Sequence, residues 1–287
     1  MLTHFAENEI ALAVEDSPRN PEPQIYLSNA RARYRDHGRP YTIAIVVPIT
    51  NDAAKAEEML RGVADAQAQF NSRGGRNGRL LEVLIVNDGN AADVSATVSE
   101  YIAAMPEILG VVGHNSSGAS LAAKAAYEKT NLPMISPTSS STDLQGQIFF
   151  RTIPSDSAMG KSLARYAVSN MKAENVVILH DSNSGYSQSL LRTFMSEFPG
   201  EVLKLVNLSS LISREVLENE ANQLPNQTDT IVLFPSTSTF PTAINYLKAI
   251  SMAQENNNFR LIGGESLYTP KTLVVKKTQS SLNLRTG

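Results

Sequence analysis

The chain has 287 residues, of which 42% are hydrophobic and 18% are charged, and its formal net charge is −3. This composition is typical of a globular chain with one large or two medium domains. The small net charge gives no reason to expect nucleic acid or an anionic membrane as a partner. Cysteine is absent, which excludes disulfides and thiolate chemistry. No apolar run approaches the roughly 20 residues of a membrane-spanning helix.

Residues 1–40 differ from the remainder and predict a helical hairpin. Apolar residues recur at helical spacing on both sides of "DSPRNPEP", whose three prolines predict a turn. The stretch "NPEPQIYLSNARAR" resembles the second half of a tetratricopeptide-type repeat, so this extension is either the remnant of a helical array or a plain helical addition. The first 20 residues lack the basic start and apolar core of a signal peptide. Export from the cytoplasm would then depend on another segment.

From Tyr41 the sequence alternates between short apolar strands and helices of about 10 to 15 residues. This alternation predicts an α/β fold with doubly wound, Rossmann-like parallel sheets. A polar serine–threonine segment interrupts it, so we expect two lobes, 41–148 and 149–270, with a cleft between them, and an irregular tail over 271–287. The predicted strands lie at 41–48, 80–88, 108–113, 132–137, 149–156, 175–181, 201–208, 228–235 and 259–265.

Two kinds of site find little support in the motifs. No phosphate-binding G-x-x-x-x-G-K-[ST] or G-x-G-x-x-G motif occurs. The arginine-rich "NSRGGRNGRL" follows the predicted end of a helix, whereas anions favour helix N-termini, so we expect a glycine turn with solvated arginines. The four histidines are scattered along the chain. We therefore expect no metal and no other cofactor.

Serine chemistry needs a closer look, because "GHNSSG" combines a histidine with two serines. The stretch lacks the G-x-S-x-G spacing of a nucleophile elbow. His114 lies only two residues from Ser116 on the same loop, and Asp88 would have to orient the histidine. A hydrolase that uses Ser116 stays open as an alternative function.

The same residues also suit a site that binds a ligand and carries out no reaction, which we call a ligand seat. "HNSSGAS" and "SPTSSST" each follow a predicted strand, and ligands of doubly wound sheets bind beyond the carboxyl ends of the strands. The first loop also opens a helix, whose free N–H groups suit a carboxylate. Glu265 follows the last predicted strand and suits an ammonium group. The plainer alternative is that Ser116 and Ser117 only cap the helix.

The chain from Tyr41 to Pro270 resembles the type I periplasmic binding proteins of the branched-chain amino-acid (Leu/Ile/Val) type. The resemblance rests on "PITNDAAKAEEMLRGVADAQAQFNSRGGRNGRLLEVLIVNDG", "GVVGHNSSGASLAAKAAYEKTNLPMISPTSSST", "FFRTIPSDSAMGKSLARY" and "LIGGESLYTP", which occur in the family's order. It implies two α/β lobes around a hinge that close on an amino acid or a related small carboxylate or amide. It implies no catalytic step.

The resemblance also implies roles for single residues. By position, Ser116 matches the serine that holds the ligand carboxylate, and its neighbour Ser117 belongs to the same candidate site. Thr138 and Ser140 match positions of the second loop that contribute a backbone group and a hydroxyl. Tyr186 matches an aromatic residue that covers the ligand, and Glu265 matches the acid that binds the ligand's ammonium group. Both are therefore candidate ligand-binding residues. The "LFPST" stretch departs from an aromatic position of some members.

The implied role is uptake through the membrane subunits of an ABC transporter, or ligand sensing within a multidomain receptor. Either would place the module outside the cytoplasm. The family's chain adds further strands and helices to the first lobe after the equivalent of Pro270, so we expect that lobe to be incomplete, with apolar surface uncovered. A truncated interaction domain that binds no small molecule is therefore a further alternative.

Overall fold

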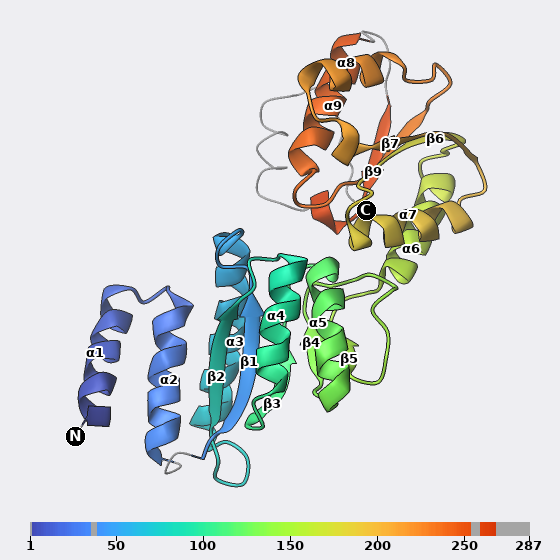
Figure 1. Ribbon diagram of the computed structural model, residues 1–287. Coiled ribbons are helices and arrows are strands. Elements are labelled where there is room, and N and C mark those ends of the chain that lie inside the picture. Colours follow the sequence, from blue (N-terminus) through green and yellow to red (C-terminus); the bar gives the residue numbers. More distant parts are fainter. Residues whose placement is uncertain (1, 36–38, 254–258, 268–287) are drawn as a thin grey trace. The chain divides into compact units, whose positions relative to one another are not determined.

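The computed structural model describes residues 2–35, 39–253 and 259–267 (Figure 1). These residues form two compact units. The first holds the described residues up to Ser139 together with Leu144–Ile153, and the second holds Ser140–Asp143 and the described residues from Pro154 onward. The predicted irregular tail, 271–287, lies outside the described residues.

The first unit is built around a parallel sheet with the strand order β2-β1-β3-β4-β5, as the alternating pattern predicts. Its strands are β1 (Tyr41–Val47), β2 (Leu81–Asn87), β3 (Ile108–Val112), β4 (Met134–Ser136) and β5 (Phe149–Arg151). Its helices are α1 (Leu2–Asp16), α2 (Pro21–Arg35), α3 (Ala53–Ser72), α4 (Ala92–Ala103) and α5 (Ser117–Thr130).

Helices pack on both faces of this sheet, because the strands are apolar on both sides. On one face, α2 and α3 cover β1 and β2 with a cluster that includes Ile25, Met59 and Leu60. On the other face, α4 and α5 contribute Ile102 and Tyr127 to a second cluster. The result is a three-layer α/β arrangement, which agrees with the doubly wound fold expected from the sequence.

Part of the sheet in the first unit leaves apolar side chains exposed. Ile135 of β4 and Phe150 of β5 are register partners, and their side chains are 42% and 51% exposed. Leu109 of β3 is 52% exposed. Neighbouring apolar side chains on a sheet are usually covered, so the expectation of uncovered apolar surface on the first lobe is confirmed at these positions.

The helical hairpin predicted for the N-terminus is present as α1 and α2. The turn between them is shorter than "DSPRNPEP" suggests, because α2 already begins at Pro21. Proline is well suited to the first helical position, where its missing N–H has no partner to lose. Asn20 caps the helix by accepting a hydrogen bond from the Glu22 N–H, 3.1 Å away.

Helix α2 covers the outer edge of the sheet. β2 is an edge strand, so some of its backbone groups point away from β1. The Asn29 side chain pairs with both such groups of Val83: its amide donates to the carbonyl (2.8 Å) and its oxygen accepts from the N–H (2.9 Å). Asn71 of α3 makes the same pair of bonds with Leu81. Two side-chain amides thus replace a neighbouring strand.

The second unit has a smaller parallel sheet with the order β7-β6-β8-β9. Its strands are β6 (Asn175–His180), β7 (Glu201–Asn207), β8 (Thr230–Phe234) and β9 (Arg260–Gly263). Its helices are α6 (Asp156–Ser169), α7 (Gly185–Glu197), α8 (Arg214–Asn222) and α9 (Phe240–Ala253), with short 3₁₀ turns η1 (Leu208–Ser210) and η2 (Glu265–Leu267).

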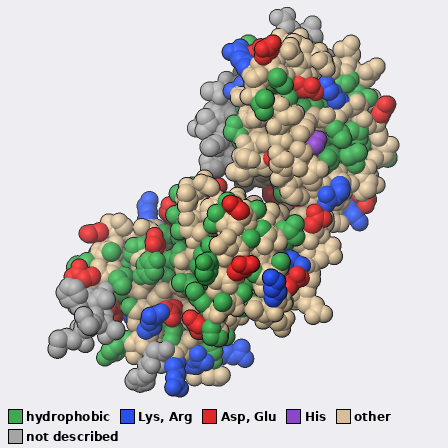
Figure 2. Space-filling view, viewed as in Figure 1, with side chains coloured by type: hydrophobic (Ala, Val, Ile, Leu, Met, Phe, Trp, Pro, Cys, Tyr) green, Lys and Arg blue, Asp and Glu red, His purple; other side chains and the backbone are tan. Residues whose placement is uncertain are grey.

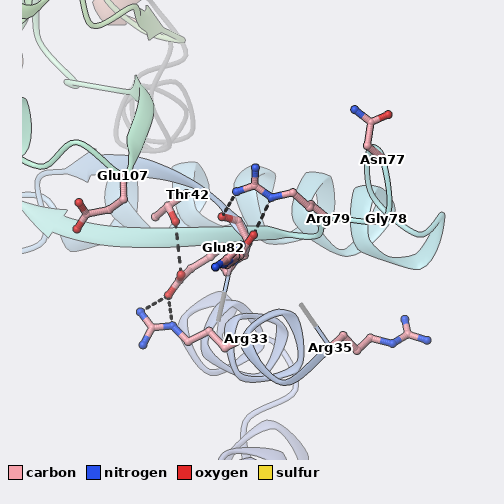
Figure 3. A pocket seen from close by; sticks show the side chains of 10 residues that line it. Arg33, Arg35, Thr42, Asn77, Gly78, Arg79, Glu82 and Glu107 are labelled. Atoms are coloured by element: carbon pink, nitrogen blue, oxygen red, sulfur yellow. Dashed lines mark hydrogen bonds and ion pairs between the residues drawn. The ribbon is translucent and has the colours of Figure 1, made fainter. Parts of the chain in front are cut away.

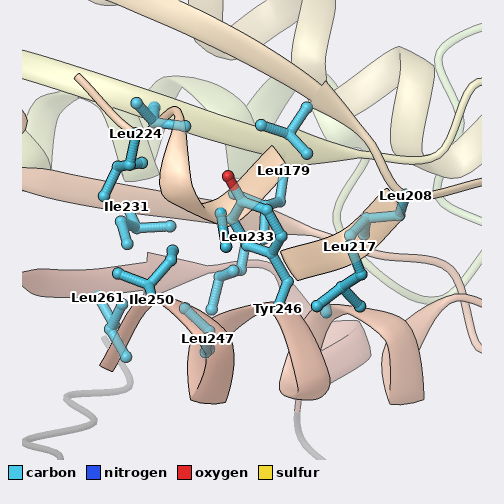
Figure 4. Packing of buried hydrophobic residues seen from close by; sticks show 14 of the residues in the cluster. Leu179, Leu208, Leu217, Leu224, Ile231, Leu233, Tyr246, Leu247, Ile250 and Leu261 are labelled. Carbon is cyan, nitrogen blue, oxygen red and sulfur yellow. The ribbon is translucent and has the colours of Figure 1, made fainter. Parts of the chain in front are cut away.

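This sheet is also covered on both faces. Helices α8 and α9 bury Leu217, Tyr246 and Ile250 against Leu179 and Leu233 of the central strands (Figure 4). Helices α6 and α7 cover the opposite face, where Phe194 stacks on Phe198 at a ring-centroid distance of 5.2 Å. Among the described helices, none combines the length and apolar character needed to cross a membrane.

The cover of β2 by Asn29 can be tested by substitution. We expect Asn29→Leu, which keeps the branched shape of the side chain but removes its hydrogen-bonding groups, to lower the free energy of unfolding by about 2–4 kcal/mol, because both backbone groups of Val83 lose their partners and the Gln67 amide loses one of its two acceptors. Urea denaturation measures the loss, and hydrogen exchange should show faster exchange of the Val83 amide. Gln69→Leu, at an exposed amide of α3, serves as the control. Unchanged protection of Val83 would contradict the assignment.

Candidate ligand-binding site

His114 anchors the loop between β3 and α5. Its side chain is fully buried. Nδ1 lies 2.7 Å from the Asp88 Oδ2 atom, and Nε2 lies 3.1 Å from the Tyr127 hydroxyl. Because the carboxylate only accepts hydrogen bonds, Nδ1–H donates to Asp88, and Nε2 is paired with the Tyr127 hydroxyl. Both ring nitrogens are thus occupied by partners other than Ser116, and the Ser116–His114 pair that a hydrolase would need is not formed.

The carboxylate of Asp88 is stabilised in its charged form. Burial, the largest influence, would raise its pKa. Hydrogen bonds from His114, from the Asn90 N–H and from the Ser95 hydroxyl outweigh burial and hold the pKa of Asp88 below its ordinary value. Burial and the nearby charge of Asp88 raise the pKa of Tyr127. This buried network fixes the carboxyl ends of β2 and β3 to helix α5.

The two serine-containing loops predicted to form a ligand seat do meet in the first unit. The His114 carbonyl accepts hydrogen bonds from the hydroxyls of Ser136 (3.0 Å) and Ser139 (3.3 Å). The Thr138 hydroxyl donates to the Asn115 carbonyl at 2.6 Å. Thr138 is half-buried, and its hydroxyl therefore has a structural role in joining the loops.

Ser116 is the N-cap of α5, as the plainer alternative expected. Its Oγ accepts a hydrogen bond from the Ala119 N–H at 3.2 Å, and its own N–H donates to the Asn90 Oδ1 atom at 2.9 Å. The capping oxygen keeps its O–H free to donate to another group. Ser117 is the first residue of the helix and is buried, so it is not the cap.

The other three candidate residues lie together in the second unit. The buried Ser140 hydroxyl donates to Glu265 Oε1 at 3.2 Å, and the Tyr186 hydroxyl lies 3.4 Å from Glu265 Oε2. The carboxylate itself is exposed. Burial and the charge of Glu265 raise the pKa of Tyr186, so the phenol stays protonated and can donate. The second unit therefore presents an exposed carboxylate held by two hydroxyls.

Three residues that the sequence analysis did not single out lie next to these candidate residues: Gly264 and Ser266 next to Tyr186, and Asn90 next to Ser116. Gly264 gives the Tyr186 ring room, since a Cβ atom at this position would lie 2.3 Å from the Tyr186 hydroxyl. Ser266 contacts the same hydroxyl. Asn90, which holds the Ser116 N–H, follows β2 within "NDGN". Its place directly after a strand is the same signal that identified the serine loops.

The polar pair His180–Asp181, at the end of β6, has its hydrogen-bond partners within the second unit. Asp181 accepts hydrogen bonds from the Ser236 hydroxyl (2.5 Å) and the Asn183 N–H (2.9 Å). Burial lowers the pKa of His180. Phe234, at the position that departs from some members of the resembled family, is fully buried in the core. Among the described residues, no group of acidic and histidine side chains has the arrangement of a metal site.

The buried Asp88–His114 pair predicts a specific pH dependence. Because folding lowers the pKa of Asp88, its ionised carboxylate adds stability above the unfolded-state pKa of about 3.9, and this is lost as the pH falls through the lower folded-state pKa. We expect Asp88→Asn to cost about 3 kcal/mol near pH 7, and the difference from wild type to shrink below about pH 4. Urea denaturation across pH tests this, with Asp93→Asn, at an exposed aspartate, as control. A difference that does not change with pH would contradict it.

Residues 40–207, more than half of the chain, match the family model described as "Periplasmic binding protein". One relative is the Leu/Ile/Val-binding protein homolog 2 of Brucella abortus (strain 2308), 31% identical over 153 residues, which are 52% of this chain and 40% of the relative. The Leu/Ile/Val-binding protein of Escherichia coli (strain K12) is 26% identical over 154 residues, which are 52% of this chain and 41% of the relative. The match thus spans about two fifths of these relatives.

Solved structures share the fold. The branched-chain amino acid transporter substrate binding protein LivJ from Streptococcus pneumoniae, in complex with isoleucine, superimposes with a TM-score of 0.67 at 24% identity, covering 79% of this chain and 65% of that protein. A leucine binding protein from Thermotoga maritima gives a TM-score of 0.67 at 20% identity, covering 82% and 66%. These named relatives are binding proteins. From its family match, the chain belongs to the periplasmic binding protein family.

Proposed function

We propose that this chain binds an amino acid, or a similar small carboxylate or amide, with polar residues of both units. The observation that carries the proposal is that each unit holds one of two chemically complementary groups. The first unit offers the N-terminus of α5 with the Ser116 hydroxyl, and the second offers the exposed carboxylate of Glu265. A zwitterion needs one seat of each kind.

The first seat suits a carboxylate for electrostatic reasons. The N-terminus of α5 carries the positive end of the helix dipole and N–H groups without helical partners. Ser116 adds a hydroxyl whose oxygen is fixed by the Ala119 N–H. The Thr138 hydroxyl joins the second loop to the Asn115 carbonyl, and in this proposal Thr138 and Ser117 supply backbone groups next to Ser116. In this proposal, the first unit recognises the carboxylate through dipoles and hydrogen bonds, without a fixed positive side chain.

The second seat suits an ammonium group. Glu265 supplies the negative charge, and the hydroxyls of Ser140 and Tyr186 fix its two oxygens. The Tyr186 ring also offers an aromatic surface to the ligand. The names of the relatives, which include Leu/Ile/Val-binding proteins, support an aliphatic amino acid as the first ligand to test.

We infer that the chain acts without catalysis, and that it delivers its ligand to the membrane subunits of an ABC transporter or reports ligand to further domains of a sensor. The buried contacts of His114 support the non-catalytic role, because they leave Ser116 without a neighbouring base. Family membership supports a location outside the cytoplasm. The helical extension over residues 1–40, a tetratricopeptide-like remnant in this proposal, favours the sensor. A co-purification with transporter subunits would favour uptake instead.

A thermal-shift screen against the twenty amino acids and short-chain amides tests the proposal. A ligand at about 100 times its dissociation constant should stabilise the folded protein by roughly 2.7 kcal/mol. The far-ultraviolet circular dichroism of the same sample establishes that it is folded. A flat screen on folded protein would reject the binding function and favour an interaction domain.

Ser116→Asp separates capping from ligand binding. Aspartate caps helices as well as serine, so stability should change little. Its charge would repel a ligand carboxylate by about 4 kcal/mol at a separation near 4 Å, which corresponds to a loss of amino-acid affinity of roughly 100- to 1000-fold. Calorimetry with the best ligand of the screen measures the loss. Ser213→Asp, at the N-cap of α8, is the matched control. Full affinity in Ser116→Asp would remove this residue from the site.

Glu265→Gln tests the ammonium seat in the same assay. The substitution keeps the shape of the side chain and removes its charge, so amino-acid affinity should fall by roughly 10- to 100-fold, as for the loss of one charge-assisted hydrogen bond. A carboxylate of the same carbon skeleton without an amino group should lose far less. Glu201→Gln, at an exposed glutamate of β7, controls for the change in net charge. Equal losses for both compounds would show that Glu265 does not bind the ammonium group.

A further inference from the structure

A pocket lies in the first unit, away from the Ser116 loop. It is a cavity of about 870 Å³ lined by the end of α2, the start of β1 and the turn before β2. This is the amino end of the parallel strands, whereas the serine loops follow their carboxyl ends. In the space-filling view, Lys and Arg side chains gather at this lower end of the first unit (Figure 2). We call this cavity the arginine pocket.

The arginine pocket is positively charged although the chain is not. Its lining includes four arginines and two glutamates, Arg33, Arg35, Arg39, Arg79, Glu82 and Glu107, which leaves a net charge of +2. Arg33 already neutralises Glu82, with its Nε 2.6 Å from Glu82 Oε1 (Figure 3). Arg35 and Arg39 form no ion pair with any residue that the structure describes. Both side chains are exposed.

A third guanidinium is held in place by the backbone. The turn Arg76–Arg79 is closed by two backbone hydrogen bonds, with positive φ angles at Asn77 and Gly78, so the position of Arg79 just before β2 is fixed. The Arg79 guanidinium donates to the carbonyls of Arg39 (2.7 Å) and Pro40 (3.0 Å) and lies 4.1 Å from the centre of the Tyr41 ring. These bonds use two of its five N–H donors.

The glycine turn expected in "NSRGGRNGRL" is present, and its three arginines are exposed as expected. Arg79 is exposed but fixed, and it tightens the junction between α2 and β1. The expectation that this region does not favour anions was based on the helix dipole at the end of α3. The positive charge of the pocket comes instead from side chains of separate segments, which the sequence does not show to be neighbours.

We propose that the arginine pocket binds a small, multiply charged phosphate anion. Guanidinium groups match phosphate oxygens with paired N–H donors and remain charged at every physiological pH. The net charge of the lining would be balanced by a divalent group. A nucleic acid or a membrane surface would need a broad positive field, whereas the chain as a whole carries −3. The charge is local, which favours a small anion.

Inorganic pyrophosphate is the probe for this site. Isothermal titration calorimetry of the full chain at low ionic strength should show saturable binding of one pyrophosphate that weakens as salt is added. We expect the double variant Arg35→Glu/Arg39→Glu to weaken binding by roughly 100-fold, about tenfold for each lost charge-assisted contact. Arg35→Gln/Arg39→Gln, a milder pair, should also weaken it and provides the result if the first variant does not fold.

The matched control is Arg19→Glu/Arg73→Glu, which changes the net charge equally at two exposed arginines of the same unit outside the pocket. It should keep full pyrophosphate binding. Amino-acid binding should be equal in all variants, which separates this site from the Ser116 loop. Equal pyrophosphate affinity in the pocket and control variants would overturn the proposal, and so would the absence of binding by the wild type. Binding only to vesicles that contain phosphatidylglycerol would also overturn it.

Discussion

The buried pairing of Asp88 with His114 is the constraint on which the candidate site in the first unit depends. A buried carboxylate is costly unless hydrogen bonds and an opposite charge compensate it. Here the compensation comes from His114, Ser95 and a backbone N–H, drawn from three segments. With its ring held on both sides, His114 directs its carbonyl toward the hydroxyls of Ser136 and Ser139. The conformation of the loop before α5 therefore depends on residues that do not have to contact a ligand.

The second unit solves a different electrostatic problem. Glu265 is exposed, so its charge does not need a buried hydrogen-bond network to compensate it. The hydroxyls of Ser140 and Tyr186 only orient its carboxylate. An oriented, hydrated carboxylate can exchange water for a ligand cation at low cost, because its hydrogen-bond partners are already in place. The close approach of Tyr186 depends on the absence of a side chain at Gly264. In this unit a glycine thus contributes to the candidate site as much as a polar residue does.

The N-terminal helices have a physical role that is independent of any ligand. An edge strand with unpaired backbone groups invites pairing with another chain, and α2 prevents this by placing Asn29 against Val83. The same helix brings Arg33 and Arg35 to the amino end of the sheet, where the arginine pocket lies. Covering the edge and building that pocket are consequences of one packing contact, since both require α2 to lie along β2.

The order of strands and helices, the parallel sheets and the position of the serine loops at strand ends could be predicted from the sequence, because they follow from local hydrophobic periodicity. The alternative that Ser116 caps α5 is confirmed by its contact with the Ala119 N–H. Tertiary structure decided the remainder. The contacts of Asn29 with Val83, of His114 with Asp88 and of Arg79 with Tyr41 join residues tens of positions apart. Such partners are chosen by three-dimensional packing, and no local pattern in one sequence records that choice.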